Sequence, residues 1–237
     1  MSTLAVRDLD VFIQTSHILR RVSLDVGPED VVCLVGRNGA GKTTLLRTVM
    51  GYLRPRAGTI AFKGAPIAGL PTHEIAQGGI GFAPEDSGIF ADLTVAENIE
   101  IATWTRAGGR PASERIEAAY GVFPVLRGYA ARKGPAMSGG ERKMLSIARA
   151  LALDPELLLL DEPFEGLSPA IIPAVAAGIG AITRRGHAIL LAESNIHHVP
   201  EFAGRLYVIE RGEIIFAGRP DEVHRDAGVM RVIGGAA

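Results

Sequence analysis

The feature that most constrains the fold is a glycine-rich loop between an apolar run and a helical pattern. Residues 31–35 read Val-Val-Cys-Leu-Val, and residues 36–43 read Gly-Arg-Asn-Gly-Ala-Gly-Lys-Thr, which fits the spacing of a phosphate-binding loop. Residues 43–50 lack Pro and Gly and repeat apolar side chains at helical spacing. The sequence therefore predicts a buried strand, a tight turn and a helix in this order, the context that the motif requires.

The residue types in this loop suit ATP with Mg²⁺. Glycines let main-chain N–H groups approach phosphate oxygens, and the following helix directs its positive end at them. We expect Lys42 to neutralise the β- and γ-phosphates and the Thr43 hydroxyl to bind Mg²⁺, which prefers hard oxygen ligands. The predicted nucleotide ligands are Gly36, Arg37, Asn38, Gly39, Ala40, Gly41, Lys42, Thr43 and Thr44.

An acid pair follows a second apolar run. Leucines at 157–160 precede Asp161 and Glu162 and indicate a strand that is buried on both faces. The carboxyl end of such a strand is where open α/β sheets bind ligands. We expect Asp161 to hold Mg²⁺ through its water shell and Glu162 to act as general base on the attacking water, although the pair alone is equally typical of an ordinary strand end.

Residues 138–141, Ser-Gly-Gly-Glu, predict a second phosphate site. Ser138 and Glu141 have capping-box spacing before an apolar stripe at helical spacing, so a helix begins here. Gly139 and Gly140 leave N–H groups at the mouth of this helix open to an anion. Helix capping accounts for Ser138 and Glu141 but leaves the two glycines unexplained. One chain thus offers two half-sites.

In this order, the three elements resemble the ATP-binding subunit of ABC transporters, from about residue 4 to the C-terminus. The resemblance implies an α/β fold: a P-loop NTPase core with a mixed, mostly parallel sheet flanked by helices, an N-terminal antiparallel β subdomain and an inserted helical subdomain. It implies one nucleotide-binding domain over 1–237, with the core at about 1–90 and 152–237 and the helical subdomain at 91–151. In the family two subunits pair head to tail, so Ser138, Gly139 and Gly140 would complete the ATP site of a second subunit.

Local patterns fit this organisation. Residues 4–35 alternate short apolar runs with turn signals, as expected for the antiparallel sheet. Further strands and helices are predicted from apolar runs and periodicity. The strands are predicted at 59–64, 157–160, 188–192 and 205–210, and the helices of the insert at 94–104 and 113–123.

Between core and insert, Pro84 and Glu85 resemble the Q-loop of the family. Most members carry Gln where Glu85 stands. Members that serve branched-chain amino acid importers commonly carry Pro-Glu, and also Gly-Leu-Ser/Ala-Pro after the acid pair, which residues 166–169 match. The resemblance implies that Glu85 binds Mg²⁺ through its water shell and senses the γ-phosphate; alternatively it is a solvated loop acid.

Apolar side chains flank this segment. Phe82, Ile89 and Phe90 either line an exposed groove that receives a helix of a permease or pack in the core. The sequence leaves both interpretations open.

Two positions depart from the family pattern. Ser194 stands where a strand of the family ends in a His that contacts the γ-phosphate, and Ser cannot offer a cation. His197 and His198 follow it, but their position alone does not bring them to the nucleotide. For the aromatic that stacks on adenine, an ungapped reading gives Ile13, and a one-residue shift brings Phe12 over the base. Phe12 is equally compatible with packing in the small sheet.

Composition narrows the class of protein. A net charge of −1 with scattered basic residues gives no reason to expect a nucleic-acid partner. The single cysteine, Cys33, is predicted to be an inert core thiol in a reducing compartment. No apolar stretch approaches the length that crosses a bilayer. Any membrane role must then come through a partner. The resemblance to ABC transporter subunits implies a peripheral location at the cytoplasmic face of the inner (plasma) membrane.

The resemblance implies an ATP-binding and ATP-hydrolysing subunit of an ABC importer for branched-chain or other hydrophobic amino acids, or related small solutes. Its expected partners are membrane permease subunits, a second ATPase subunit, identical or paralogous, and indirectly a solute-binding protein. Because of Ser194, one alternative is a weakly hydrolysing nucleotide clamp for a paralogous partner. Another is an ATPase for lipid or lipopolysaccharide export, which shares the pattern at 93–98. Gln at position 85 and His at position 194 would have supported this alternative, but the chain has Glu85 and Ser194 there.

Overall fold

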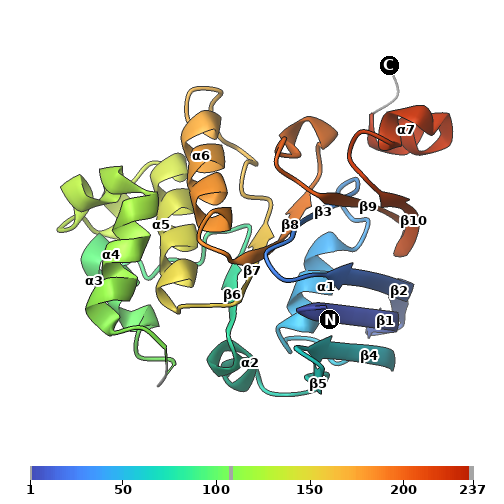
Figure 1. Cartoon of the computed structure of the whole chain (residues 1–237), viewed down its shortest axis with the longest axis horizontal. Helices are drawn as coiled ribbons and strands as arrows, with labels where there is room; N and C mark the ends of the chain where they lie inside the picture. The colour runs from blue at the N-terminus through green and yellow to red at the C-terminus, as the bar shows by residue number, and fades with distance from the viewer. Residues whose placement is uncertain (1, 107–108, 235–237) are drawn as a thin grey trace.

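The strands form two sheets that enclose one helix between them in the computed structural model, which describes residues 2–106 and 109–234 (Figure 1). The smaller sheet has the order β2-β1-β4-β5, and the larger has the order β10-β9-β3-β8-β7-β6. The α/β architecture expected from the sequence is thereby confirmed.

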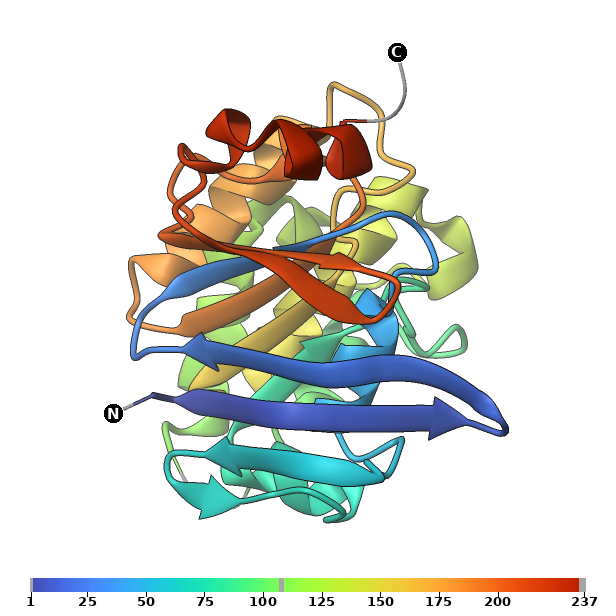
Figure 2. The same ribbon diagram turned by 90° about the vertical axis from the view of Figure 1, so that its right-hand side faces the viewer.

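The smaller sheet is antiparallel and faces the viewer in the lower half of Figure 2. Its strands are β1 (Leu4–Ile13), β2 (Ser16–Val26), β4 (Ala57–Phe62) and β5 (Ala65–Pro66). The strand predicted at 59–64 therefore ends earlier. Lys63 and Gly64 have φ values of 51° and 82°, which form the turn into β5 rather than extended backbone.

The larger sheet carries the parallel part of the fold. Its strands are β3 (Val31–Val35), β6 (Ile80–Ala83), β7 (Leu157–Asp161), β8 (Ala188–Glu193), β9 (Arg205–Glu210) and β10 (Glu213–Gly218). All neighbours are parallel except β10, which pairs antiparallel with β9 at the edge. The four predicted strands in this region are confirmed, and β7 and β8 extend as far as Asp161 and Glu193.

Helix α1 (Lys42–Val49) packs between the two sheets. Leu45 and Leu46 belong to the same apolar cluster as Leu34 of β3. Cys33 points to the opposite face of β3, because strand side chains alternate, and it is fully buried. Burial raises the pKa of the Cys33 thiol to about 12, so it stays protonated, as predicted for an inert core thiol.

The other helices cover the remaining surfaces of the larger sheet. α3, α4, α5 and α6 gather on its far face, at the left in Figure 1. Their bounds are Val95–Ala102, Ala112–Val122, Gly139–Ala152 and Ile172–Thr183. The remaining short elements are α2 (Thr72–Gly78), α7 (Ala227–Ile233), η1 (Pro124–Tyr129), η2 (Gly134–Ala136), η3 (Ile196–His198) and η4 (Val223–Arg225).

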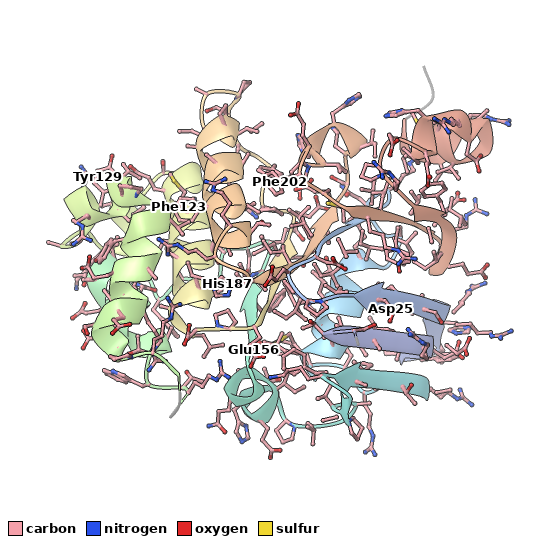
Figure 3. All side chains as sticks on the ribbon, viewed as in Figure 1. Asp25, Phe123, Tyr129, Glu156, His187 and Phe202 are labelled. Atoms are coloured by element: carbon pink, nitrogen blue, oxygen red, sulfur yellow. The ribbon has the colours of Figure 1, made fainter. Side chains whose placement is uncertain are left out.

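The helices predicted at 94–104 and 113–123 correspond to α3 and α4. Thr94 caps α3 in a capping box with Glu97, so the helix itself begins at the next residue. Phe123, in the helical layer of Figure 3, is buried against α6 where Gly178 leaves room for its ring. Over the ranges that the structure describes, none of the helices has the length and apolar character needed to cross a membrane.

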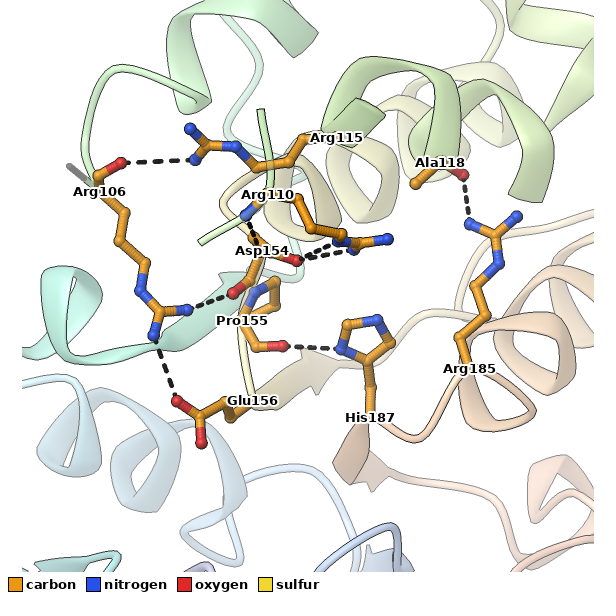
Figure 4. A network of polar contacts seen from close by, with 9 residues as sticks. All are labelled: Arg106, Arg110, Arg115, Ala118, Asp154, Pro155, Glu156, Arg185 and His187. Atoms are coloured by element: carbon orange, nitrogen blue, oxygen red, sulfur yellow. Dashed lines mark hydrogen bonds and ion pairs between the residues drawn. The ribbon is translucent and has the colours of Figure 1, made fainter. Parts of the chain in front are cut away.

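A polar network joins the helical layer to the start of β7 (Figure 4). The Arg110 guanidinium contacts Asp154 Oδ1 at 2.6 and 3.0 Å. Arg106 donates to the Asp154 carbonyl oxygen and, at 3.2 Å, to Glu156. The loop before α4 is thus tied to the segment between α5 and β7, the strand that ends in Asp161.

Candidate functional site

A cavity of about 420 Å³ opens beside the glycine-rich loop, where α1, the end of β1 and the acid pair meet. Most of the predicted loop ligands line it: Asn38, Gly39, Gly41, Lys42, Thr43 and Thr44. Glu85 and Glu162 face the same cavity, although they are far apart in the sequence. The cavity therefore brings together residues of the loop, the Glu85 segment and Glu162 of the acid pair.

The remaining predicted ligands, Gly36, Arg37 and Ala40, do not line the cavity, and Gly36 and Ala40 instead anchor the loop. Gly36 has no room for a side chain, since a Cβ would lie 2.3 Å from the carbonyl oxygen of Ile209. Its N–H donates to the Glu193 carbonyl oxygen at 3.1 Å, and the Ala40 carbonyl accepts from Gly212 at 2.9 Å. These main-chain hydrogen bonds therefore anchor the loop to β8 and to the turn between β9 and β10.

Lys42 is the most constrained cation of the loop, with 5% of its surface exposed. Its Nζ donates to the carbonyl oxygens of Gly36 and Arg37 at 2.7 and 3.3 Å. The same atom lies 3.0 Å from Glu162 Oε1. An anion that enters this cavity therefore competes with Glu162 for the ammonium group.

Thr43 lines the cavity, and the buried Asp161 lies next to it; together they offer oxygen atoms that suit a cation. The Thr43 hydroxyl donates to Asp161 Oδ1 at 3.1 Å. Burial raises the pKa of Asp161 to about 6, the Thr43 hydroxyl opposes this rise, and Glu85 and Glu162 add to it. A desolvated carboxylate with further acids nearby is stabilised by a positive ion.

The donor set fits Mg²⁺. Threonine and carboxylate oxygens are hard ligands, and Mg²⁺ in such sites keeps several waters and binds substrate phosphates. Within the described ranges, no group of three or more His, Cys, Asp or Glu residues is arranged to hold a metal ion without other ligands. Thr43 and Asp161 would therefore share the ion with water and a phosphate group, with Glu85 close by.

Glu162 is held in an unusual backbone conformation. Its φ is 48°, in the left-handed region that side chains disfavour, and it is 3% exposed. Its N–H donates to the Ala192 carbonyl at 3.0 Å, and its Oε2 accepts from the Ser194 N–H at 2.9 Å. The predicted switch position thus reaches Glu162 through the main chain of Ser194.

Glu193 lies behind Glu162, and the sequence analysis did not identify it. It is fully buried, and its Oε1 accepts from the Phe164 N–H at 3.2 Å. Its Oε2 lies 3.1 Å from His198 Nδ1. Burial, with Glu162 nearby, raises the pKa of Glu193 far above its ordinary value. The signal in the sequence was an acid at the end of a predicted buried strand, next to Ser194.

The N-terminal strand presents Ile13, rather than Phe12, to the cavity. Phe12 instead stacks on His17, with ring centroids 4.1 Å apart, and the Arg56 guanidinium lies 4.9 Å above its ring. Adjacent strand residues point to opposite faces, so both cannot line one cavity. Of the two positions that the sequence offered for contact with a base, Ile13 therefore lines the cavity and Phe12 does not. Glu165, which the sequence analysis passed over, also lines the cavity.

A larger groove, of about 1020 Å³, borders this cavity. Thr43, Thr44 and Ile13 line both hollows. Next to them, Pro84 and Asp86 face the groove while Glu85 faces the cavity. One short segment therefore contacts both spaces.

The groove has an apolar floor. Phe82 and Phe90 line it together with Tyr52, and Phe90 is 49% exposed. Ile89 does not line it; its side chain packs against the main core and lies close to Gly134. Of the two interpretations that the sequence left open, Ile89 fits core packing and Phe90 fits the groove, whereas Phe82 lines the groove and also packs against the apolar cluster around α1.

The predicted second half-site lies at the start of α5. Ser138 Oγ accepts from the Glu141 N–H at 3.3 Å, and Glu141 Oε2 accepts from the Ser138 N–H at 2.7 Å, which confirms the capping box. Ser138 and Gly139 are exposed, but Gly140 is buried, and a Cβ on it would lie 2.7 Å from the Ile171 side chain, so packing within the chain accounts for the second glycine. The cavity beside the phosphate loop is lined by other residues, so the two half-sites of one chain are separate.

Comparison with known proteins identifies the family. The family model described as ABC transporter matches residues 19–165. The chain is 36% identical over 233 residues to the lipopolysaccharide export system ATP-binding protein LptB of Haemophilus influenzae, covering 98% of this chain and 97% of that protein. It is 36% identical over 208 residues to the probable branched-chain amino acid transport ATP-binding protein LivF of Archaeoglobus fulgidus, covering 87% and 88%.

A solved structure agrees with these relatives. The ADP conformation of MJ1267, an ATP-binding cassette of an ABC transporter, superposes with a TM-score of 0.84 at 26% identity over the whole of both chains. Both the sequence match and the fold therefore include the phosphate loop, the start of α5 and the acid pair. This chain belongs to the ABC transporter family, as one of its ATP-binding, ATP-hydrolysing subunits.

Proposed function

We propose that this chain is the ATPase subunit of an ABC importer for branched-chain or other hydrophobic amino acids, or related small solutes. The observation that carries the proposal is the segment Pro84-Glu85-Asp86, which contacts both the nucleotide cavity and the groove. It bears the Pro-Glu pair that resembles branched-chain amino acid importers. The similarity to LivF supports the same assignment.

In this proposal the cavity binds ATP through the loop 36–44 and Lys42. Thr43 and Asp161 hold Mg²⁺, with Glu85 acting through its water shell. When bound, the ion supplies positive charge beside the phosphates. Glu162 accepts a proton from the attacking water, and the Ser194 N–H keeps its carboxylate directed into the cavity.

The second part of the proposal is a head-to-tail dimer with an identical or paralogous subunit. Ser138 and Gly139 are exposed, and a Cβ on Gly139 would meet no atom within 4 Å. Packing within one chain therefore gives no reason for glycine at this position. Close approach of a phosphate group held by a second subunit would give one.

The third part concerns the membrane. The groove beside Glu85 has aromatic residues on its floor and Arg47 and Arg149 among its lining residues. This combination suits an amphipathic helix of a permease subunit. The chain would then be peripheral, at the cytoplasmic face of the plasma membrane, and a solute-binding protein would act with it only indirectly.

One observation favours a second candidate, lipopolysaccharide export. LptB of Haemophilus influenzae aligns with nearly the whole chain at the same identity as LivF. Either transport function uses the same ATP site. The alternative suggested by Ser194, a nucleotide-binding clamp that hydrolyses ATP weakly, differs from the importer and the exporter in its lower rate of ATP turnover.

The first experiment measures MgATP turnover of the purified chain beside Glu162→Gln, at several protein concentrations, together with the ratio of monomer to dimer. Turnover that rises faster than linearly with concentration, and that Glu162→Gln abolishes while an ATP-bound dimer accumulates, supports a self-sufficient ATPase. Nucleotide binding without turnover supports the clamp. The chain is then reconstituted with its permease subunits. Uptake of radiolabelled leucine with a binding protein supports import, whereas lipopolysaccharide release from the membrane refutes it.

A further inference from the structure

Lys143 lies in α5, about one helical turn after Gly140, and its side chain points into the protein. It is 7% exposed. A buried lysine in the apolar stripe of a helix is costly unless its ammonium group finds partners. Its partners therefore indicate what the residue does.

The Lys143 ammonium joins two segments of the nucleotide cavity. Its Nζ donates to the Glu85 carbonyl oxygen at 2.6 Å and to the Glu162 carbonyl oxygen at 2.8 Å. These are main-chain atoms of Glu85 and Glu162, two of the three acids that line the cavity. One side chain therefore links α5, the Glu85 segment and the turn after β7.

The bond to Glu162 acts at a strained position. Glu162 keeps its left-handed backbone only while its surroundings hold it, because that conformation costs free energy. Its N–H is fixed by Ala192 and its carbonyl by Lys143. Hydrogen bonds from a charged donor are stronger than neutral ones, so loss of the ammonium loosens the direction of the Glu162 carboxylate.

We propose that Lys143 is a positioning residue that transmits the state of the half-site at the start of α5 to Glu162 and Glu85 of the same chain. In a head-to-tail dimer, Ser138 and Gly139 meet the ATP of the second subunit, while Lys143 on the same helix holds the catalytic turn of its own site. A shift of α5 on binding ATP at one site thereby moves the general base of the other. The inference rests on the proposed function of both half-sites.

The test compares Lys143→Met, which retains the apolar stem but no donor, with Lys143→Arg, which keeps a charged donor. Lys143→Met is expected to lower kcat by about ten- to a hundredfold with KM for MgATP within about twofold, as misdirection of one catalytic group does. Lys143→Arg is expected to restore part of the loss. Lys133→Met, at an exposed lysine of the helical region, is the matched control and should turn over like the wild type.

The melting temperature of each variant and its affinity for a fluorescent ATP analogue distinguish a positioning role of Lys143 from a role in stability alone. If Lys143→Met melts earlier but turns over normally per folded molecule, the inference is wrong. If Lys143→Met does not fold, Lys143→Gln, which offers only a shorter neutral donor, takes its place, since a positioning role predicts a lowered kcat in a folded protein that binds nucleotide normally. Wild-type kcat in Lys143→Gln would then contradict the inference.

Transmission from the other half-site is tested by a double-mutant cycle with Ser138→Ala. If Lys143 carries the signal, the double variant loses little more kcat than the worse single variant, whereas independent roles multiply the two losses. If the loss of kcat in the double variant equals the product of the two single losses, Lys143 does not transmit the state of the other half-site. Failure of the proposed function is distinguishable, because Glu162→Gln would then leave turnover intact in the same assay.

Discussion

Glu162 Oε1 lies 3.0 Å from Lys42 Nζ, and both side chains are 4% exposed. The proposed general base and the phosphate-binding lysine therefore neutralise each other inside the cavity. In the proposed ATP site, the phosphates must displace this ion pair to reach the lysine, so phosphate binding and release of the proposed general base would be coupled at one contact.

Removal of the Glu162 charge should tighten ATP binding as well as stop hydrolysis. Glu162→Gln frees Lys42 from its competitor, so we expect ATP affinity to rise by about tenfold while turnover falls by at least about a hundredfold. Equilibrium binding of ATP and steady-state phosphate release measure the two effects. Glu213→Gln, at an exposed acid outside the cavity, is the control and should leave turnover within about twofold of the wild type. Unchanged ATP affinity in Glu162→Gln would contradict the coupling.

The ion pair between Lys42 and Glu162 should also contribute to the free energy of unfolding. Lys42→Met leaves Glu162 as a buried charge without its cation, so we expect a loss of about 3 kcal/mol in the free energy of unfolding. The double variant Lys42→Met with Glu162→Gln should recover most of it, because no unpaired charge remains. Urea unfolding without nucleotide measures the cycle. Additive losses would show that the two side chains do not interact.

Stability should also depend on pH through Glu193. Burial, with Glu162 nearby, raises the pKa of Glu193 from 4.5 to about 9. Between these values the folded protein holds a proton that the unfolded chain releases. Stability from this group is therefore fully present below pH 4.5 and is lost as pH rises toward 9, by at most about 1.4 kcal/mol per pH unit.

Urea unfolding of wild type and Glu193→Gln at pH 7.5 and pH 9 tests this dependence, in a range where ordinary histidines are already neutral. The wild type should lose stability between the two values, and Glu193→Gln should lose distinctly less. Glu213→Gln, at an exposed acid, serves as control and should follow the wild type. Parallel curves for wild type and Glu193→Gln would mean that Glu193 is ionised in the folded protein.

Binding of Mg²⁺ should weaken in mild acid. The pKa of Asp161 is raised to about 6, chiefly by burial, so a proton competes with the cation as pH falls below that value. Titration of Mg²⁺ into the protein with a fluorescent ATP analogue at pH 5.5 and pH 8 should give the tighter binding at pH 8. Asp161→Asn should lose the Mg²⁺ response at both values but still bind nucleotide through the loop. A Mg²⁺ affinity equal at both pH values in the wild type would exclude Asp161 as the group that titrates.

Local patterns predicted much of the fold. The strand at 31–35, the loop after it and the start of α5 depend on neighbouring residues, and hydrophobic periodicity, glycine spacing and capping residues all act over a few positions. Motif boundaries were less accurate: the strand at 59–64 ends early because Lys63 takes the backbone conformation of a turn. Such limits depend on backbone angles, which apolar patterns do not specify.

Residue types and their order along the chain determined the phosphate loop, the acid pair, the capped helix and the family. Only the tertiary structure decided that Ile13 rather than Phe12 lines the cavity, and that Ile89 packs in the core. It also placed Glu193 beside Glu162 and carried the Lys143 ammonium to the carbonyls of Glu85 and Glu162. These contacts join residues that are far apart in the sequence or depend on which face of a strand turns inward. The long-range contacts and the inward face of each strand are both fixed by the packing of the two sheets around α1 and of α5 against the larger sheet. Buried charged groups are stable only beside partners, and those partners come from other parts of the chain.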